Sequence, residues 1–352
     1  MRQFCGGTQI CFGLGCLKNI DPGRVLVVSD PYFYENGTAA KIAGGAEAVR
    51  YFYKVSPDPS VALAAEGAAA VKEFVPDTIL ALGGGSAMDC AKAMAYFSGT
   101  SAKLIAIPTT SGSGSEVTDF AILTHDGVKH PLVDPKLRPA MAILDGSLVA
   151  KLPKNLIADG GFDVLTHALE AYVAKNATPY SDALAAGAFR DTLNGLLASY
   201  RGDLEARTRV HYAATGAGLA FTNAGLGLCH ALAHSLGGAF HIPHGRLNAI
   251  LLPAVLNHSP SPRYGELARL AGLEGKAQTV AQRNLRNALL RLRRELELPS
   301  TLAEAGVSPS DVRKNSESIL KAALSDPCCD TNPTPVTMEM ARAVLSEVTG
   351  HG

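Results

Sequence analysis

The pattern of hydrophobic and polar positions changes character near residue 150. In the first half, short aliphatic and β-branched runs indicate buried strands at 24–29, 78–82, 104–108 and 140–144. Segments 61–74 and 87–97 have apolar residues at helical spacing and predict helices between these strands. Ser86 and Asp89, three residues apart, resemble a capping box at the start of the second helix. Strand–helix alternation of this kind predicts a parallel sheet covered by helices on both faces.

The second half shows almost continuous helical periodicity, interrupted by Pro and Gly. Helices are expected at 155–175, 181–199, 208–221, 226–240, 245–257, 263–272 and 276–298, with shorter segments to 349. A chain of 352 residues exceeds the usual size of a single core. The sequence therefore predicts an α/β domain over 1–150, with a Rossmann-like sheet, and an all-α domain over 151–352.

Small and acidic residues follow the predicted strands where ligands of parallel sheets bind. Asp30 ends the first strand, the glycine turn with Gly84, Gly85 and Ser86 ends the second, and Thr109–Ser115 ends the third. A glycine turn that opens a helix directs amide N–H groups at a pyrophosphate. The Asp30 carboxylate would accept the ribose hydroxyls and repel a 2′-phosphate, which favours NAD over NADP. The alternative is a tight turn without a ligand and an Asp30 that only caps a loop, because the spacing is not G-x-G-x-x-G.

Composition excludes several other functions. The formal net charge is zero, which argues against nucleic acid or an anionic membrane as the main partner. No apolar run reaches the roughly 18–20 residues that a membrane span needs, and no signal-peptide core follows Met1. Seven cysteines without paired spacing indicate reduced thiols and a cytoplasmic protein.

Histidines gather in one short segment of the second half. Four of the ten lie between His230 and His244, and upstream Asp163 and His167 stand one helical turn apart. Such a pair is often a coincidence, but here it recurs in apolar surroundings, where an unsatisfied His or Asp is costly. Three histidines and a carboxylate suit Zn²⁺ or Fe²⁺ with a position left open for substrate. We therefore predict one divalent metal bound by Asp163, His167, His230 and His244.

Four motifs together make the chain recognisable. They are Gly83–Asp89, Ile107–Thr118, Gly161–Tyr172 and Gly225–Gly245. In these motifs the sequence resembles the iron-containing, or group III, alcohol dehydrogenases, and within them the compact 1-propanol dehydrogenases of diol-utilising bacterial microcompartments. The resemblance implies that family's two-domain fold and a metal held by the same one Asp and three His.

The resemblance also implies roles for other residues. His234 falls where the family has a residue near the nicotinamide that is assigned to proton relay, although a hydrogen-bonding role beside the metal is the alternative. Lys129 matches a lysine that contacts the cofactor. The cofactor-binding set is Asp30, Gly84, Gly85, Ser86, Asp89, Thr109, Thr110, Ser113 and Lys129. By their position in the motifs, Phe120, Phe162, Phe221 and Cys328 are expected to line an apolar substrate pocket.

The expected activity is interconversion of a short-chain aliphatic aldehyde, such as propanal or ethanal, and its primary alcohol with NAD(H). Fe²⁺ is the expected metal and Zn²⁺ the alternative. Two other readings stay open: a glycerol- or hydroxy-acid-type dehydrogenase on the same fold, or an inactive metal-binding scaffold homologue. From the resemblance we also expect a homodimer and association with a microcompartment.

Overall fold

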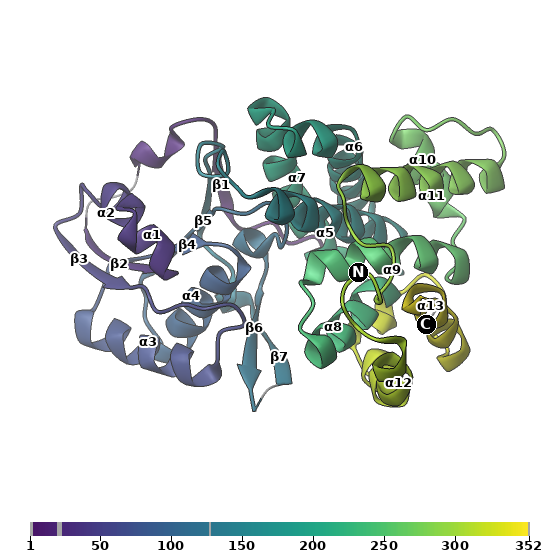
Figure 1. Cartoon of the computed structure of the whole chain (residues 1–352). Coiled ribbons are helices and arrows are strands. Elements are labelled where there is room, and N and C mark those ends of the chain that lie inside the picture. Colours follow the sequence, from purple (N-terminus) through teal and green to yellow (C-terminus); the bar gives the residue numbers. More distant parts are fainter. Residues whose placement is uncertain (1–2, 20–22, 127, 351–352) are drawn as a thin grey trace. The chain divides into compact units, whose positions relative to one another are not determined.

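The computed structural model describes residues 3–19, 23–126 and 128–350 (Figure 1). The chain divides into two compact units, one formed by Cys5–Leu152 and the other built chiefly from Pro153–Gly352. The first combines strands and helices, whereas the second is helical (Figure 1).

A six-stranded sheet forms the centre of the first unit. Its strands are β1 (Gln9–Phe12), β2 (Arg24–Ser29), β3 (Ala48–Phe52), β4 (Thr78–Gly83), β5 (Lys103–Pro108) and β8 (Met141–Leu144). They follow the order β1-β8-β5-β4-β2-β3, and all neighbouring strands are parallel. The predicted parallel sheet is thus confirmed, with two strands that the sequence analysis did not identify. These two, β1 and β3, are the edges, where partly exposed residues leave no continuous apolar run.

The central strands are buried on both faces. Leu26 and Val28 of β2 pack in one cluster with residues of α3 (Val61–Phe74) and α4 (Gly85–Ser98). Val25 and Val27, which point to the opposite face, pack in another cluster with Ala39 of α2 (Thr38–Ile42). Burial on both faces explains why these strands are continuous apolar runs rather than alternating patterns.

The start of α4 differs from the prediction. The N-cap residue is Gly84, it makes no side-chain cap bond, and Ser86 lies inside the helix. Asp89 instead accepts hydrogen bonds from Ser115 Oγ at 2.7 Å and from the Ile122 backbone N–H at 3.0 Å. The capping-box prediction was therefore wrong, because the Asp89 carboxylate faces the segment after β5 and not the start of its own helix.

Smaller elements complete the first unit. The helix α1 (Pro31–Glu35) follows β2, and the 3₁₀ turns are η1 (Cys16–Asn19), η2 (Ser115–Val117) and η3 (Pro135–Leu137). An antiparallel pair, β6 (Phe120–His125) and β7 (Val128–Val133), forms a separate sheet that the apolar pattern did not predict. Most β7 side chains are exposed, which explains why its sequence carries little strand signal.

The second unit consists of packed helices. They are α5 (Lys154–Val173), α6 (Pro179–Tyr200), α7 (Leu204–Ala224), α8 (Leu228–Phe240), α9 (His244–His258), α10 (Arg263–Leu270), α11 (Gln278–Glu295), α12 (Pro309–Leu324) and α13 (Met338–Thr349), with the 3₁₀ turn η4 (Pro327–Thr331) before α13. Among the described residues, α5 to α11 fall on the seven predicted ranges, and α12 and α13 lie in the stretch to 349 where only shorter segments were expected. Among these helices, none is long and apolar enough to cross a membrane.

Helix α5 is the centre of this unit. It packs against α6, α7 and α9, and almost every residue from Ile157 to Val173 is buried. A helix buried all round is normally apolar, yet α5 carries Asp159, Asp163, His167 and Glu170 inside. Buried polar groups need partners, and α8 and α9 supply them.

Candidate metal centre and cofactor loops

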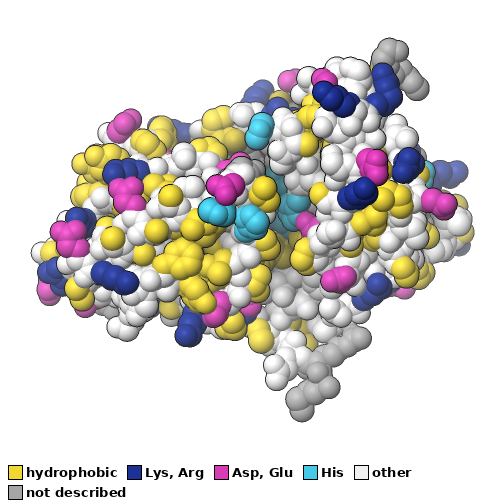
Figure 2. Space-filling model, turned by 90° about the horizontal axis from the view of Figure 1, so that it is seen from below, with side chains coloured by type: hydrophobic (Ala, Val, Ile, Leu, Met, Phe, Trp, Pro, Cys, Tyr) yellow, Lys and Arg dark blue, Asp and Glu magenta, His cyan; other side chains and the backbone are white. Residues whose placement is uncertain are grey.

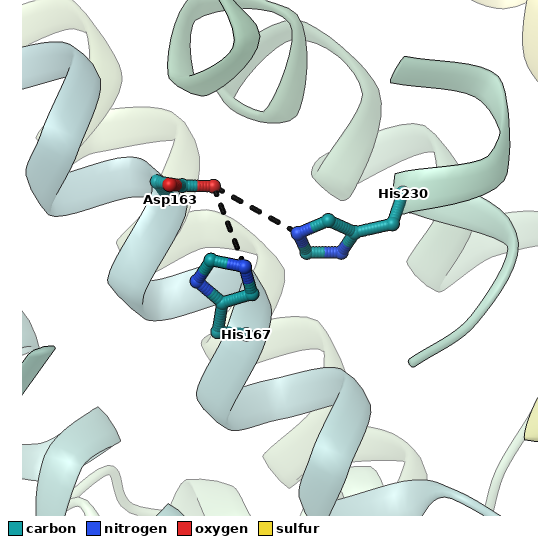
Figure 3. Close-up of side chains that lie close together, drawn as sticks. All are labelled: Asp163, His167 and His230. Atoms are coloured by element: carbon teal, nitrogen blue, oxygen red, sulfur yellow. Dashed lines mark ion pairs between the residues drawn. The ribbon is translucent and has the colours of Figure 1, made fainter. Parts of the chain in front are cut away.

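Three of the four predicted metal ligands meet between α5 and α8. Asp163 and His167 point from successive turns of α5 toward His230 of α8 (Figure 3). The Asp163 Oδ1 atom is 3.8 Å from Nε2 of His167 and 3.8 Å from Nε2 of His230. All three residues are buried, and one ligand atom from each lies within 4.8 Å of the others.

The fourth predicted ligand, His244, begins α9 and reaches the same carboxylate. Its Nε2 atom is 3.4 Å from Asp163 Oδ1. Two ligands that bind one ion at about 2.1 Å with a tetrahedral angle lie about 3.4 Å apart. The separations of 3.4–3.8 Å around Asp163 Oδ1 are close to that value. The donor set of three imidazoles and a carboxylate therefore fits a divalent transition metal.

Glu170 fixes the orientation of His230. Its Oε2 atom lies 2.6 Å from His230 Nδ1, and the same carboxylate accepts the backbone N–H groups of Gly227 and Cys229. With Nδ1 bound to Glu170, the Nε2 atom of His230 is the one that faces Asp163. A carboxylate behind a histidine is the usual support of a metal-binding imidazole.

Asn248, on α9, lies among the ligand atoms. It is fully buried, and its Nδ2 atom is 2.8 Å from Asp163 Oδ1, 3.3 Å from His244 Nε2 and 3.4 Å from His230 Nε2. The amide donates to the Asp163 carboxylate and so restricts its rotation.

The electrostatics of the cluster favour an ionised carboxylate. Burial alone would raise the pKa of Asp163, but the neighbouring His167, His244 and His230 outweigh it and hold this pKa well below its usual value. Burial would lower the pKa of His230, whereas its contacts with Asp163 and Glu170 raise it to about 9. The imidazole of His230 must lose this proton before it can bind a metal through Nε2.

His234 lies beside this cluster and has a different partner. Its Nδ1 atom is 2.7 Å from Oδ2 of Asp326, the residue that caps η4. Its ring stacks on that of His244, with centroids 5.2 Å apart. The His234 side chain is 40% exposed, so the cluster reaches the surface. Figure 2 shows histidine side chains gathered on one face of the molecule, with acidic side chains beside them.

In the first unit, the three predicted cofactor segments follow the carboxyl ends of the neighbouring strands β2, β4 and β5 and lie side by side. A Cβ atom added to Gly84 would lie 3.2 Å from Thr110 Oγ1, and one added to Gly85 would lie 3.1 Å from Ser113 Oγ. The glycines thus allow close contact between the two loops. Asp30 follows the adjacent strand β2 and accepts a hydrogen bond from the Phe33 backbone N–H, so it caps α1. The capping role, the alternative to ribose binding for Asp30, is therefore present in the structure.

Lys92 of α4 makes hydrogen bonds to the segment that follows β5. Its buried ammonium group donates to Ser115 Oγ at 2.9 Å, Thr118 Oγ1 at 2.8 Å and the Phe120 carbonyl at 2.9 Å. Burial lowers the pKa of Lys92 to about 8 against the opposing effect of Asp89. The chain therefore places a costly buried amine where it connects α4 to the segment after β5.

Of the remaining predicted residues, some lie close to the metal cluster or the cofactor loops and others do not. The Thr109 backbone N–H bonds the Gly83 carbonyl at 2.9 Å, and Lys129 on β7 forms an ion pair with Asp58 at 2.6 Å. Phe221 stacks on His167, with ring centroids 4.4 Å apart. Cys328 lies near His234 and Asp326. Phe162 has 0% exposed surface, and Phe120 belongs to the first unit on β6.

Sequence reasoning assigned no role to Glu170, Asn248, Asp326 or Lys92. Two of them carried a usable signal: Glu170 follows His167 by three residues and Asn248 follows His244 by four, spacings that put each pair on one helix face. Asp326 carried none, because 92 residues separate it from His234.

Comparison with known families gives matches over most of the chain. The model described as "Iron-containing alcohol dehydrogenase" matches residues 7–146, and the model "Fe-containing alcohol dehydrogenase family, C-terminal" matches residues 157–349. A solved structure, the iron-containing alcohol dehydrogenase from Thermococcus thioreducens, superposes with a TM-score of 0.90 at 34% identity. That likeness covers 99% of this chain and 100% of the other.

Individual relatives differ in length. The chain is 39% identical to the bifunctional aldehyde-alcohol dehydrogenase AdhE of Escherichia coli, over 93% of this chain but only 43% of that protein. It is 37% identical to the 1-propanol dehydrogenase PduQ of Salmonella typhimurium, over 99% of this chain and 100% of that protein. It is 36% identical to an NADPH-dependent butanol dehydrogenase of Clostridium saccharobutylicum, over 98% and 97% respectively.

Proposed function

The chain belongs to the iron-containing alcohol dehydrogenase family, and we propose that it interconverts a short-chain aliphatic aldehyde and its primary alcohol with NAD(H). The observation that carries this proposal is the set of Asp163, His167, His230 and His244 around one carboxylate oxygen. Full-length similarity to a 1-propanol dehydrogenase supports a substrate of the propanal or ethanal type.

Asp163, His167, His230 and His244 would hold one divalent metal, with Fe²⁺ as the first choice and Zn²⁺ as the alternative. Such an ion supplies Lewis acidity toward the alcohol or carbonyl oxygen. Glu170 orients His230, and Asn248 restrains Asp163. Both contacts keep the ligand atoms in place, so little reorganisation is needed when the metal binds.

The cofactor-binding proposal rests on the first unit. Gly84, Gly85 and Ser86 begin α4, where backbone N–H groups suit a pyrophosphate. Beside this turn lie Thr109, Thr110 and Ser113. Hydrogen bonds from Ser115 to Asp89 and from Lys92 to Ser115 fix the segment that follows. The Asp30 carboxylate would select the unphosphorylated ribose of NAD, and Lys129 would contact the cofactor. Because one relative is an NADPH-dependent butanol dehydrogenase, activity is measured with NADH and with NADPH separately.

We propose that His234 is the residue that transfers the proton during the reaction. Because Nδ1 is directed at Asp326, the opposite nitrogen Nε2 is available to exchange a proton with substrate or water. The exposure of His234 gives that proton a route to solvent. Phe221 and Cys328, both close to the histidines, would form part of an apolar pocket. Phe162 is fully buried in α5, and a pocket role for Phe162 and for Phe120 of β6 stays a prediction from the sequence.

We further propose that Cys5–Leu152 is the NAD-binding domain and that the rest is the metal-binding and catalytic domain. The family relationship suggests a cytoplasmic homodimer, and the similarity to PduQ suggests association with a bacterial microcompartment. Light scattering on the purified protein and fractionation of cells that carry microcompartments would test these two points.

A substrate panel combined with metal analysis tests the proposed function. Propanal, ethanal, dihydroxyacetone and a keto acid would be offered with NADH and with NADPH, after the metal content has been measured. We expect propanal or ethanal with NADH to give the highest kcat/KM, and His230→Ala to lose both metal and activity. A His230→Ala protein that kept both would show that the ligand assignment is wrong.

A further inference from the structure

A second group of metal-binding side chains lies outside the four-residue set. The His234 imidazole of α8, the Asp326 carboxylate and the Cys328 thiol of η4 each offer one ligand atom, and these atoms lie within 4.8 Å of one another. Within the described residues, only this group and the one around Asp163 meet that condition. The proposed function uses His234 for proton transfer and Cys328 for the pocket wall, and neither role requires the three donor atoms to lie together.

The Asp326 carboxylate is already held in position between the other two residues. Asp326 Oδ1 accepts the Cys328 backbone N–H at 2.8 Å, and Oδ2 lies 2.7 Å from His234 Nδ1. The carboxylate is therefore fixed on both sides and is 15% exposed, whereas the His234 side chain is 40% exposed. A metal ion from solvent would find the His234 imidazole accessible and the Asp326 carboxylate already oriented, which lowers the ordering cost of binding.

The donor atoms indicate which ion would bind. Nitrogen, oxygen and sulfur together suit Zn²⁺ or Co²⁺, whereas Mg²⁺ and Ca²⁺ prefer oxygen alone. The first cluster has three nitrogens, one oxygen and no sulfur among its proposed ligands. We propose that His234, Asp326 and Cys328 form a second, solvent-accessible site for Zn²⁺, with water completing the coordination.

Binding at this site would affect the reaction through His234. The ring of His234 stacks on that of His244 at an interplanar angle of 16°. A Zn²⁺ ion bound through Nδ1, the nitrogen that faces Asp326, leaves the hydrogen of the imidazole on Nε2. The ring can then no longer accept a proton at Nε2, and it is fixed beside His244. We therefore expect reversible inhibition by excess Zn²⁺. This consequence rests on the proposed function, whereas binding of the ion does not.

Cobalt substitution tests the site directly. The purified enzyme, carrying its own metal, is titrated with Co²⁺ and followed for the sulfur-to-cobalt charge-transfer band in the near ultraviolet. Because the proposed ligands of the first site include no sulfur, such a band reports the second site. We expect one additional equivalent of Co²⁺ to bind with this band, and added Zn²⁺ to remove it by competition.

Two adjacent cysteines provide a matched pair of variants. Cys328→Ser should abolish the band, whereas Cys329→Ser should keep it, because the Cys329 thiol bonds the Ala323 carbonyl at 3.1 Å. Asp326→Asn retains the thiol and should weaken Co²⁺ binding on the order of 10-fold or more, since a lost ligand costs at least as much as a lost supporting group. This variant also serves if Cys328→Ser does not fold.

The outcomes separate the new site from the proposed reaction. A wild-type protein without the band, or a band that survives in Cys328→Ser, overturns the second site. A band lost in Cys328→Ser but kept in Cys329→Ser supports it, even if no substrate is turned over. Co²⁺ or Zn²⁺ binding without inhibition of an active enzyme would leave the site standing and overturn the inhibition proposed through His234.

Discussion

The Nδ1 atom of His230 lies 2.6 Å from Oε2 of Glu170, and this contact determines which nitrogen of His230 faces Asp163. Glu170 is anchored in turn by the backbone N–H groups of Gly227 and Cys229 at the start of α8. One carboxylate on α5 therefore positions both the first turn of α8 and the histidine on it. The metal centre depends on this packing as much as on its ligands.

Replacing Glu170 should weaken metal binding without removing a ligand. Glu170→Gln keeps the size of the side chain but loses one negative oxygen, so the orientation of His230 is less well held. We expect the metal affinity to fall roughly 10–100-fold in competition with a chelator. Glu347→Gln is the matched control. The Glu347 carboxylate also pairs with a histidine, since its Oε2 atom is 2.9 Å from Nε2 of His258, but this pair is not part of the metal cluster. Equal metal affinity in the wild type and Glu170→Gln would contradict the orienting role.

The charge of Asp30 should control cofactor choice separately from its capping role. Asp30→Asn keeps an N-cap acceptor for the Phe33 N–H and removes the charge, whereas Asp30→Gly removes both. We expect both variants to raise the ratio of NADPH to NADH activity. The Asn variant should do so without loss of thermal stability. An unchanged ratio in both would remove Asp30 from the ribose site.

The fold and the four-residue cluster were largely predictable because their signals are local. Central strands such as β4 are continuous apolar runs, and Asp163 with His167 stands at helical spacing inside an apolar helix. His230 and His244 lie close in sequence, because the connection between α8 and α9 is short. It begins with His241, in the left-handed conformation, and ends with Pro243.

The partners that support the site were less predictable, for a physical reason. Hydrogen bonds such as Asp326 to His234 join segments that meet only after the helices pack. Lysine side chains are usually exposed, yet tertiary packing buries the amine of Lys92 completely. The misassigned Ser86 cap has the same origin, because Asp89 bonds a neighbouring segment rather than its own helix start.

Gly245 should be required at the start of α9. A Cβ atom there would lie 1.9 Å from the Asp159 carbonyl oxygen, which belongs to α5 and cannot move aside easily. Gly245→Ala should therefore displace the first turn of α9, with His244, and lower the free energy of unfolding by about 1–3 kcal/mol or more. Metal affinity should fall with it.

Gly187 offers the matched control for that substitution. It lies inside α6, and a Cβ atom there would meet nothing within 4 Å. Gly187→Ala should raise the free energy of unfolding by roughly 0.5–1 kcal/mol, because alanine is the better helix former. Chemical denaturation of both variants checks the pair, and a stable Gly245→Ala protein with unchanged metal affinity would argue against the close α5–α9 contact.

The buried amine of Lys92 should leave a signature in the pH dependence of stability. Burial lowers its pKa to about 8, below the 10.5 of an exposed lysine. Between these two values the unfolded chain holds a proton that the folded chain has released, so the free energy of unfolding increases with pH. Over this whole pH range the increase is about 3 kcal/mol.

Comparison of the wild type with Lys92→Met isolates that contribution, because the variant lacks only this titrating group. We expect the stability of the wild type, relative to Lys92→Met, to rise from pH 8 to pH 10.5 and to stay constant below pH 8. Lys54→Met should not reproduce this rise, since Lys54 is exposed and its contact with Glu66 raises its pKa. Parallel pH profiles for the wild type and Lys92→Met in urea denaturation would show that folding does not lower the pKa of Lys92.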